Sequence, residues 1–425
     1  MKKLKVILIG AGGRGIGYTG NMMNEKFEVV AVAEPIEARR NFIKERHNIP
    51  DEMCFESWEP LLDMPKFADI AIISTMDKLH YDPTMKAIKQ KYHLLLEKPV
   101  APTPKECIEI MKAAKENNVK VLVCHVLRYS PFFKKLKELV DSKLIGQIIS
   151  IEHDECVWNV HQSHSFVRGN WGNSDKSTSM ILQKACHDMD VLQWLVGKKC
   201  KYVQSFGSLT YFKKENAPEC SPEYCIDGCP HGEDCYYNAV KLYLEDEENL
   251  WFREAAAQKQ IPSNEDVEKA LRTTQYGKCV FKCDNNVVDH QVVNMEFEDG
   301  TTISFNMCAF NAGGRHIRVM GTDGELVGSM NDATFDFYSF KTKEHKEIKA
   351  SEIAIGETIV DGHGGGDVGI VHALYDYIAD NKTDGLLSEI DISVENHMIS
   401  FAAEKSRLEN RVISIDEFEK EVGLK

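Results

Sequence analysis

The sequence predicts an α/β fold with a doubly wound parallel sheet at the N-terminus, followed by an α+β region built on an antiparallel sheet. Strand and helix patterns alternate through the first 127 residues, which is typical of parallel sheets covered by helices. From residue 148 the strands alternate apolar and polar positions, and Asp-Gly turns occur at 299–300 and 323–324. A chain of 425 residues exceeds one ordinary core, which favours two or three domains.

The first strand, near residues 5–9, runs directly into a glycine-rich turn that consists of Gly10, Ala11, Gly12, Gly13, Arg14 and Gly15. Gly10 permits a tight turn, Gly12 lets the backbone approach a pyrophosphate, and Gly15 lets the next helix pack closely. The pyrophosphate would face the N–H groups at the start of that helix. The pattern therefore predicts a dinucleotide site. The alternative is a glycine turn that serves packing alone.

An acidic residue ends the second predicted strand, at the spacing that such sites require. Glu34 can accept hydrogen bonds from both ribose hydroxyls of NAD, and its charge would repel the 2′-phosphate of NADP. The sequence therefore predicts NAD as the cofactor, with NADP disfavoured. Arg39 and Arg40 follow on the next helix and could turn toward such a phosphate.

The remaining elements of the N-terminal part follow in order. Strands are expected at 68–75, 93–96 and 119–126, with a helix at 80–91. Thr103, Pro104 and Glu106 form a capping box that begins the next helix, and Ser130 with Pro131 begins another.

The second part mixes strands and helices. Strands are expected at 148–155, 287–297 and 301–310, and helices at 179–195, 367–379 and 393–408. A charged, cysteine-rich stretch at about 216–272 interrupts the strands as an insertion, and its cysteine-rich part at 220–235, with two glycines and two prolines, has little chance of a core of its own.

Two residues suit chemistry beside a dinucleotide. Lys98 follows Glu97 at the carboxyl end of a strand, where open α/β sheets place their ligands, and can donate to a substrate oxygen. His187 can remove a hydroxyl proton as hydride leaves the same carbon. Each residue also has a structural interpretation, as a solvated lysine or a core histidine.

These motifs together resemble the Gfo/Idh/MocA oxidoreductase family, named for glucose-fructose oxidoreductase and inositol dehydrogenase. The resemblance covers GAGGRG at 10–15, IISTMDKLHYDPTMKAI around His80, LLLEKPVAPTPKEC at 94–107, LRYSP at 127–131 and the helix of His187. It implies a Rossmann domain at 1–127 and a second domain at 128–425 with a large open, mostly antiparallel sheet. It also implies an active site between them, with Lys98 and His187 beside the nicotinamide and with cofactor contacts from Ser74, Thr75, His80 and Glu97.

One position departs from the family pattern. The carboxylate of the D-x-x-x-H pair is replaced by Gln183, which carries no charge to tune the lysine and histidine. Lys184 beside it either adds positive charge that favours an anionic substrate group or lies solvated on its helix. We expect Gln183 and Lys184 to face the substrate.

The segment at 161–171 places His161, His164, Arg168 and Trp171 just before the helix of His187. These residue types suit a sugar site, where an aromatic ring stacks on the carbohydrate and polar groups hold its hydroxyls. We expect His164, Arg168 and Trp171 to bind substrate. The alternative is a polar loop with one core aromatic residue.

Four cysteines gather in the insertion: Cys220, Cys225, Cys229 and Cys235, with His231 among them. Thiolates held together suit a structural zinc, although the paired C-x2-C spacing is missing. The alternative is a set of reduced thiols packed in a loop.

Composition limits the partners and the compartment. Fifty-one basic and 66 acidic residues give a net charge of −15, which disfavours non-specific binding to nucleic acid or anionic membranes. No apolar run reaches transmembrane length. Thirteen cysteines, an odd number, favour a reducing compartment, so we expect a cytoplasmic protein. By analogy with the family, a homo-oligomer, dimer or tetramer, is expected.

The sequence leaves three functions open. The first is an NAD-dependent oxidoreductase acting on a sugar, sugar derivative or cyclitol. The second is a redox-assisted enzyme that oxidises a sugar carbon transiently to cleave a glycoside. The third is a non-catalytic protein that senses sugars or dinucleotides, which the presence of both Lys98 and His187 disfavours.

Overall fold

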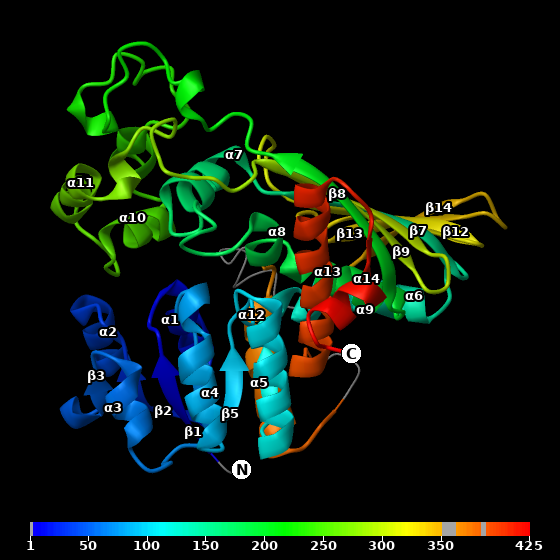
Figure 1. Cartoon of the computed structure of the whole chain (residues 1–425), viewed down its shortest axis with the longest axis horizontal. Coiled ribbons are helices and arrows are strands. Elements are labelled where there is room, and N and C mark those ends of the chain that lie inside the picture. Colours follow the sequence, from blue (N-terminus) through cyan, green and yellow to red (C-terminus); the bar gives the residue numbers. More distant parts are fainter. Residues whose placement is uncertain (1–2, 351–362, 384–387) are drawn as a thin grey trace.

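Two sheets organise the molecule, as a computed structural model of the chain shows (Figure 1). The structure describes residues 3–350, 363–383 and 388–425. Within these residues, one sheet has six parallel strands in the order β3-β2-β1-β4-β5-β6, and the other has nine strands in the order β14-β13-β12-β11-β7-β10-β9-β8-β15. The second sheet is antiparallel except where β10 pairs with β7. This arrangement confirms the predicted fold class.

The parallel sheet consists of β1 (Leu4–Ile9), β2 (Phe27–Ala33), β3 (Cys54–Phe55), β4 (Ile70–Ile73), β5 (His93–Leu96) and β6 (Val121–Val123). Its helices are α1 (Gly13–Gly20), α2 (Glu37–His47), α3 (Trp58–Asp63), α4 (Tyr81–Lys89) and α5 (Pro104–Asn117), with short turns η1 (Asp51–Met53), η2 (Asp77–Leu79) and η3 (Val126–Tyr129). Thr103 caps α5 by accepting a hydrogen bond from the Glu106 N–H, and its hydroxyl donates to the Glu106 carboxylate, so the helix begins at Pro104 as predicted.

Both faces of this sheet are buried, because successive strand residues point to opposite sides. Ile7 and Ile9 join one apolar core, and Val6 and Leu8 join another. The second of these cores includes Ile370 and other residues of α12 (Gly366–Ala379). A helix from the far end of the chain therefore covers one face of the N-terminal sheet.

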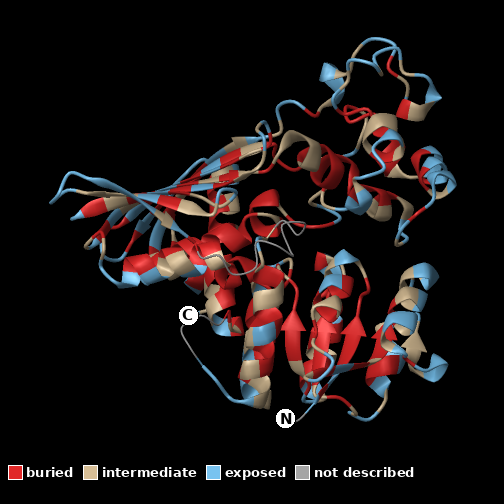
Figure 2. Ribbon diagram, turned by 180° about the vertical axis from the view of Figure 1, so that it is seen from behind, coloured by how far each residue is buried: buried red, intermediate tan, exposed pale blue. Residues whose placement is uncertain are grey.

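The antiparallel sheet consists of β7 (Ile148–Cys156), β8 (Cys200–Ser208), β9 (His290–Phe297), β10 (Thr302–Cys308), β11 (Gly314–Gly321), β12 (Gly324–Ser329), β13 (Thr334–Ser339), β14 (His345–Lys349) and β15 (Ile413–Ser414). Helices α6 (Pro131–Asp141), α9 (Cys186–Val196), α13 (Ile390–Glu409) and α14 (Ile415–Glu421) accompany it. Strand residues alternate between buried and exposed, so the sheet has one core face and one open face (Figure 2).

The helix expected at 179–195 is two helices, α8 (Met180–Gln183) and α9. The backbone leaves the α-helical region at Ala185, where ψ is 6°. The break frees the carbonyl of Gln183 from the helix, and this carbonyl accepts a hydrogen bond from the Lys98 side chain, with a donor–acceptor distance of 2.7 Å.

The insertion between β8 and β9 has more internal structure than we expected. It contains η5 (Lys214–Asn216), η6 (Cys225–Asp227), η7 (Val240–Glu245), α10 (Leu250–Ala257), α11 (Asn264–Thr273) and η8 (Gln275–Gly277). Outside the cysteine-rich part at 220–235, Tyr243, Phe252 and Leu271 are fully buried in a cluster of their own, which Cys225 joins. Aromatic rings supply the buried area that its glycines and prolines lack.

Candidate functional site

The glycine turn after β1 is shaped by close backbone contacts. Gly10 has φ +90°, and a Cβ there would lie 2.6 Å from the carbonyl oxygen of Ser74. A Cβ at Gly15 would lie 2.3 Å from the carbonyl oxygen of Gly10, whereas one at Gly12 would meet nothing within 4 Å. The first N–H groups of α1 have no side-chain cap. This start of a helix, with backbone open beside it, is suited to a pyrophosphate.

Replacing Gly15 by alanine will weaken NAD binding at least about tenfold, because its methyl group would displace the Gly10 backbone; overpacking of this kind costs about 1–3 kcal/mol. Gly17→Ala, in the same helix, is the matched control, since a Cβ there meets nothing within 4 Å. Isothermal titration with NAD compares the two variants. Equal affinities would contradict this account of the turn.

Glu34 lies buried at the end of β2 and faces the same turn. Its carboxylate accepts hydrogen bonds from the N–H of Ala11 at 2.6 Å and of Ile36 at 2.9 Å. Arg40 donates to the backbone carbonyl of Glu34 and pairs with Glu56. The Arg40 guanidinium is therefore engaged beside the strand end.

Ser74 and His80 hold the neighbouring loops. The Ser74 hydroxyl donates to the carbonyl of Gly10, and the His80 ring lies between the carbonyl oxygens of Thr75 and Pro99 at 3.0 and 2.8 Å. His80 is buried, so it contributes by positioning backbone.

A network of charged side chains joins α1 to α12. Arg14 donates to Glu97 at 2.9 Å and also pairs with Asp367 at the start of α12. Burial alone would raise the pKa of the Glu97 carboxyl, but Arg14 and Lys98 hold it below its usual value. The sequence patterns assigned no role to Asp367, because its contact with Arg14 depends on the return of α12 to the parallel sheet.

Lys98 and His187 come together from opposite sheets. Lys98 follows β5, and its ammonium group donates to the Gln183 carbonyl. His187 lies on α9 and is 3% exposed, and its Nδ1 has no hydrogen-bond partner among the described residues. Burial, followed by the charge of Lys98, lowers the pKa of His187 well below its ordinary value. The imidazole is therefore neutral at pH 7 and able to accept a proton.

Two more histidines contact His187, and a third contacts one of them. The centroids of the His125 and His363 rings lie 5.8 and 5.5 Å from the centroid of the His187 ring. The His397 ring in turn lies 5.4 Å from the His125 ring, centroid to centroid. His363 contacts Asp367 through Nδ1 at 3.2 Å.

Behind His187 lies a buried charged cluster. Lys184 Nζ is 3.3 Å from a Glu155 oxygen, and Arg315 pairs with both Glu155 and Asp188. Lys184 therefore points inward, and burial lowers its pKa despite the nearby Glu155. The sequence signal for this cluster was weak, because Glu155 and Arg315 become partners only through the register of β7 with β11.

His164 and Arg168 lie in η4 (Gln162–Arg168), which directly follows α7 (Asn159–His161), and both are buried against the insertion. His164 contacts the Tyr243 hydroxyl at 2.8 Å, and burial lowers the pKa of His164 to about 3. Arg168 donates to the backbone carbonyls of Lys278 and Tyr237. Their polar groups hold the protein together, so we leave both out of the proposed substrate site.

Trp171 links the two parts of the chain. Its indole N–H donates to Asp77 of η2 at 3.1 Å, and the Asp77 carboxylate also accepts from Ser177 and Thr178. The polar end of the indole is thereby used in a contact between domains, which leaves only its ring for a ligand.

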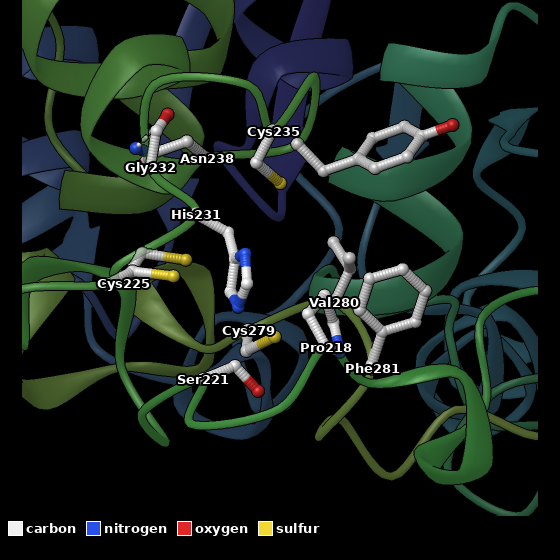
Figure 3. Close-up of a pocket in the computed structure, with 12 residues that line it drawn as sticks. Pro218, Ser221, Cys225, His231, Gly232, Cys235, Asn238, Cys279, Val280 and Phe281 are labelled. Carbon is white, nitrogen blue, oxygen red and sulfur yellow. Dashed lines mark hydrogen bonds between the residues drawn. The ribbon is translucent and has the colours of Figure 1, made fainter.

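The zinc prediction is not supported. Cys225, Cys229, His231 and Cys235 do line one small pocket, together with Cys279 (Figure 3). Yet no three His, Cys, Asp or Glu side chains within the described residues are arranged to hold a metal ion. Cys220 is exposed, the Cys225 thiol contacts Arg168 and the Lys278 carbonyl, and His231 Nε2 lies 2.7 Å from the Glu219 carbonyl. The Cys225 thiol and the His231 ring are therefore engaged with protein groups.

Comparison with known proteins matches most of the chain to one family. Residues 4–125 match the profile "Oxidoreductase family, NAD-binding Rossmann fold", and residues 137–352 match "Oxidoreductase family, C-terminal alpha/beta domain", both of the Gfo/Idh/MocA type.

Two curated relatives and one solved structure illustrate the similarity. YteT of Bacillus subtilis is 23% identical over 76% of this chain and 78% of its own length. The 2,7-anhydro-N-acetylneuraminate hydratase of Escherichia coli is 27% identical over 47% of this chain and 53% of its own. Levoglucosan dehydrogenase, solved with NADH and levoglucosan, has a TM-score of 0.70 at 16% identity and covers 97% of this chain and 100% of its own, so it shares the fold. No helix among the described residues is long and apolar enough to cross a membrane.

Proposed function

Since the chain belongs to the Gfo/Idh/MocA oxidoreductase family, we propose that it transfers a hydride between NAD and a carbon of a sugar, sugar derivative or cyclitol. The observation that carries the proposal is the convergence of Lys98 and a neutral His187 from opposite sheets. The glycine turn, the uncapped start of α1 and Glu34 fit the dinucleotide.

NAD, when bound, supplies the hydride acceptor. His187 accepts the proton of the substrate hydroxyl, because its buried ring is neutral and its Nδ1 is unpaired among the described residues. Lys98 donates to the same oxygen and polarises it. Arg14, Glu97 and Asp367 fix the glycine turn relative to the strand end that carries Lys98.

The test is NADH formation with a defined panel. The purified protein is incubated with NAD and with glucose, galactose, glucuronic acid, galacturonic acid, myo-inositol or levoglucosan. NADH formation with at least one, lost in a Lys98→Met, His187→Ala double variant, supports the proposal. Binding of these compounds without any turnover in either direction would favour a sensing protein instead.

A second function, redox-assisted glycoside cleavage, is favoured by one feature of the site. Lys184, Glu155 and His363 place additional proton-transfer groups around His187. A relative acts as a hydratase on an anhydro sugar, a reaction whose name implies no net oxidation. Release of p-nitrophenol from p-nitrophenyl glycosides with NAD present, and without net NADH, would support this function.

We expect NAD to bind at least about tenfold more tightly than NADP. A 2′-phosphate would lie beside the Glu34 carboxylate and be repelled, and Arg40 is already engaged with the Glu34 backbone and Glu56. Dissociation constants for both cofactors test this. Glu34→Gln should bring the dissociation constants for NAD and NADP closer together, because it removes the charge that repels the phosphate. Tighter NADP binding by the unmodified protein would overturn the assignment.

We also propose that the protein is a homo-oligomer that uses the open face of the nine-stranded sheet. Phe206 and Val292 are paired neighbours on β8 and β9 and are 50% and 37% exposed, and Tyr202 is 38% exposed beside them. Such a run of exposed apolar residues marks an interface more often than free surface. Light scattering of the purified protein measures its molar mass in solution. A monomer at micromolar concentration would contradict the proposed homo-oligomer.

A further inference from the structure

A row of aromatic rings leads from the insertion toward the proposed active site. It begins at Trp251 on α10 and continues through His161 and Phe166 to Trp171. The centroids of successive rings are 5.3, 5.8 and 6.2 Å apart. Trp171 contacts Asp77 of the N-terminal domain. The row therefore begins in the insertion, which carries α10 (Figure 1), and ends at a contact with η2 of the N-terminal domain.

His161 places Trp251 close to the reacting groups. Burial lowers the pKa of His161, and the charges of Lys184, Arg315 and His363 lower it further. Arg315 and His363 act on His187 in the same way. The ring that contacts Trp251, His161, is therefore reached by charges that also act on His187.

Trp251 is held firmly and yet remains open to solvent. Its ring contacts those of His161, His164 and Phe252, with centroid distances of 4.8 Å to His164 and 4.2 Å to Phe252. Even so, 47% of the residue is exposed. Leu250 beside it is 48% exposed. A fixed, half-exposed indole has the properties of a platform for the apolar face of a sugar ring.

We propose that Trp251 forms a second saccharide subsite, so that the substrate is a glycoside or oligosaccharide rather than a free monosaccharide. The reacting sugar lies at Lys98 and His187, and the next residue of the saccharide stacks on Trp251. The proposal rests on the proposed function and names the substrate class for the same site. The occupant is a neutral or acidic pyranose, whose C–H face covers the indole.

Binding is measured by isothermal titration with NADH present and with matched pairs of sugars: glucose and cellobiose, galactose and lactose, and galacturonic acid and digalacturonic acid. We expect the disaccharide of at least one pair to bind about tenfold more tightly than its monosaccharide, as burial of a large apolar surface implies. Trp251→Ala should abolish this preference and leave the monosaccharide affinity within about twofold.

Two further variants separate binding from folding. Trp251→Phe keeps a ring against Phe252 and should retain most of the preference. Tyr236→Ala removes an aromatic residue that is 79% exposed elsewhere in the insertion and should change nothing.

Monosaccharide binding with no disaccharide preference in any pair would overturn the subsite and leave the proposed function standing. Equal weakening of both members of a pair by Trp251→Ala would also overturn it. If none of the six sugars binds, the subsite and the carbohydrate substrate class are both wrong.

Discussion

Replacing His187 by alanine will lower turnover at least about a hundredfold, because a positioned base contributes roughly 10² to 10⁴ in rate. The affinity for NAD should stay within a few-fold, since the glycine turn and Glu34 lie in the other domain and are untouched. The loss should therefore appear in kcat, measured with the first substrate that the panel identifies.

An exposed histidine, His345, serves as the control for this variant. His345→Ala removes a histidine whose side chain is 63% exposed on the outer strand β14, and it should leave turnover unchanged. Near-normal turnover of both His187→Ala and Lys98→Met would show that the proposed site is wrong. His161 with Lys184 would then be the leading candidate, because His164 and Arg168 are committed to the insertion core.

The pH dependence of kcat/KM for substrate oxidation should carry the signature of His187. Only the neutral ring can accept a proton, and burial together with Lys98 lowers the pKa of that ring well below its ordinary value of about 6.5. Activity should therefore persist as the pH falls through about 6.5 and be lost only at lower pH, when the ring becomes protonated. An acid limb centred above about 6.5 would contradict this assignment.

Local sequence patterns predicted the features that depend on a few adjacent residues. The glycine turn from Gly10 to Gly15 and the cap at Thr103 each follow from short-range geometry. The strand positions of the parallel sheet also follow, because both of its faces are buried and its strands are nearly continuous apolar runs.

Features that depend on contacts distant in sequence could not be predicted in this way. Arg14 meets Asp367 only because α12 returns to cover the parallel sheet, and Glu155 meets Arg315 only through strand register. The same limit applies to Arg168. Its residue type suits a ligand, but the fold places backbone carbonyls around its guanidinium.

The position of Gln183 shows how the fold changes the meaning of a substitution. The absence of a carboxylate there left Lys98 without the ionic partner that the family pattern implies. In the structure the helix break after Gln183 turns its backbone carbonyl toward Lys98, and this carbonyl accepts a hydrogen bond from the Lys98 ammonium group. The ammonium group is therefore positioned by a neutral carbonyl, and its charge acts on both Glu97 and His187.

This arrangement predicts the effect of Lys98→Met, which keeps the length of the side chain and removes its charge. Turnover should fall at least about a hundredfold, because the substrate oxygen loses its donor. The acid limb of the residual activity should also move to higher pH. Removing a neighbouring positive charge makes protonation of His187 easier and so raises the pKa of its ring.

Lys98→Arg is the matched control for charge. It keeps a cation near His187, so its acid limb should stay where it is in the unmodified protein even if turnover falls because the guanidinium reaches the oxygen differently. A rate loss in Lys98→Met without any movement of the limb would mean that the lysine acts on the substrate alone. Movement of the limb in both variants would mean that the position of the side chain, rather than its charge, sets the pKa of His187.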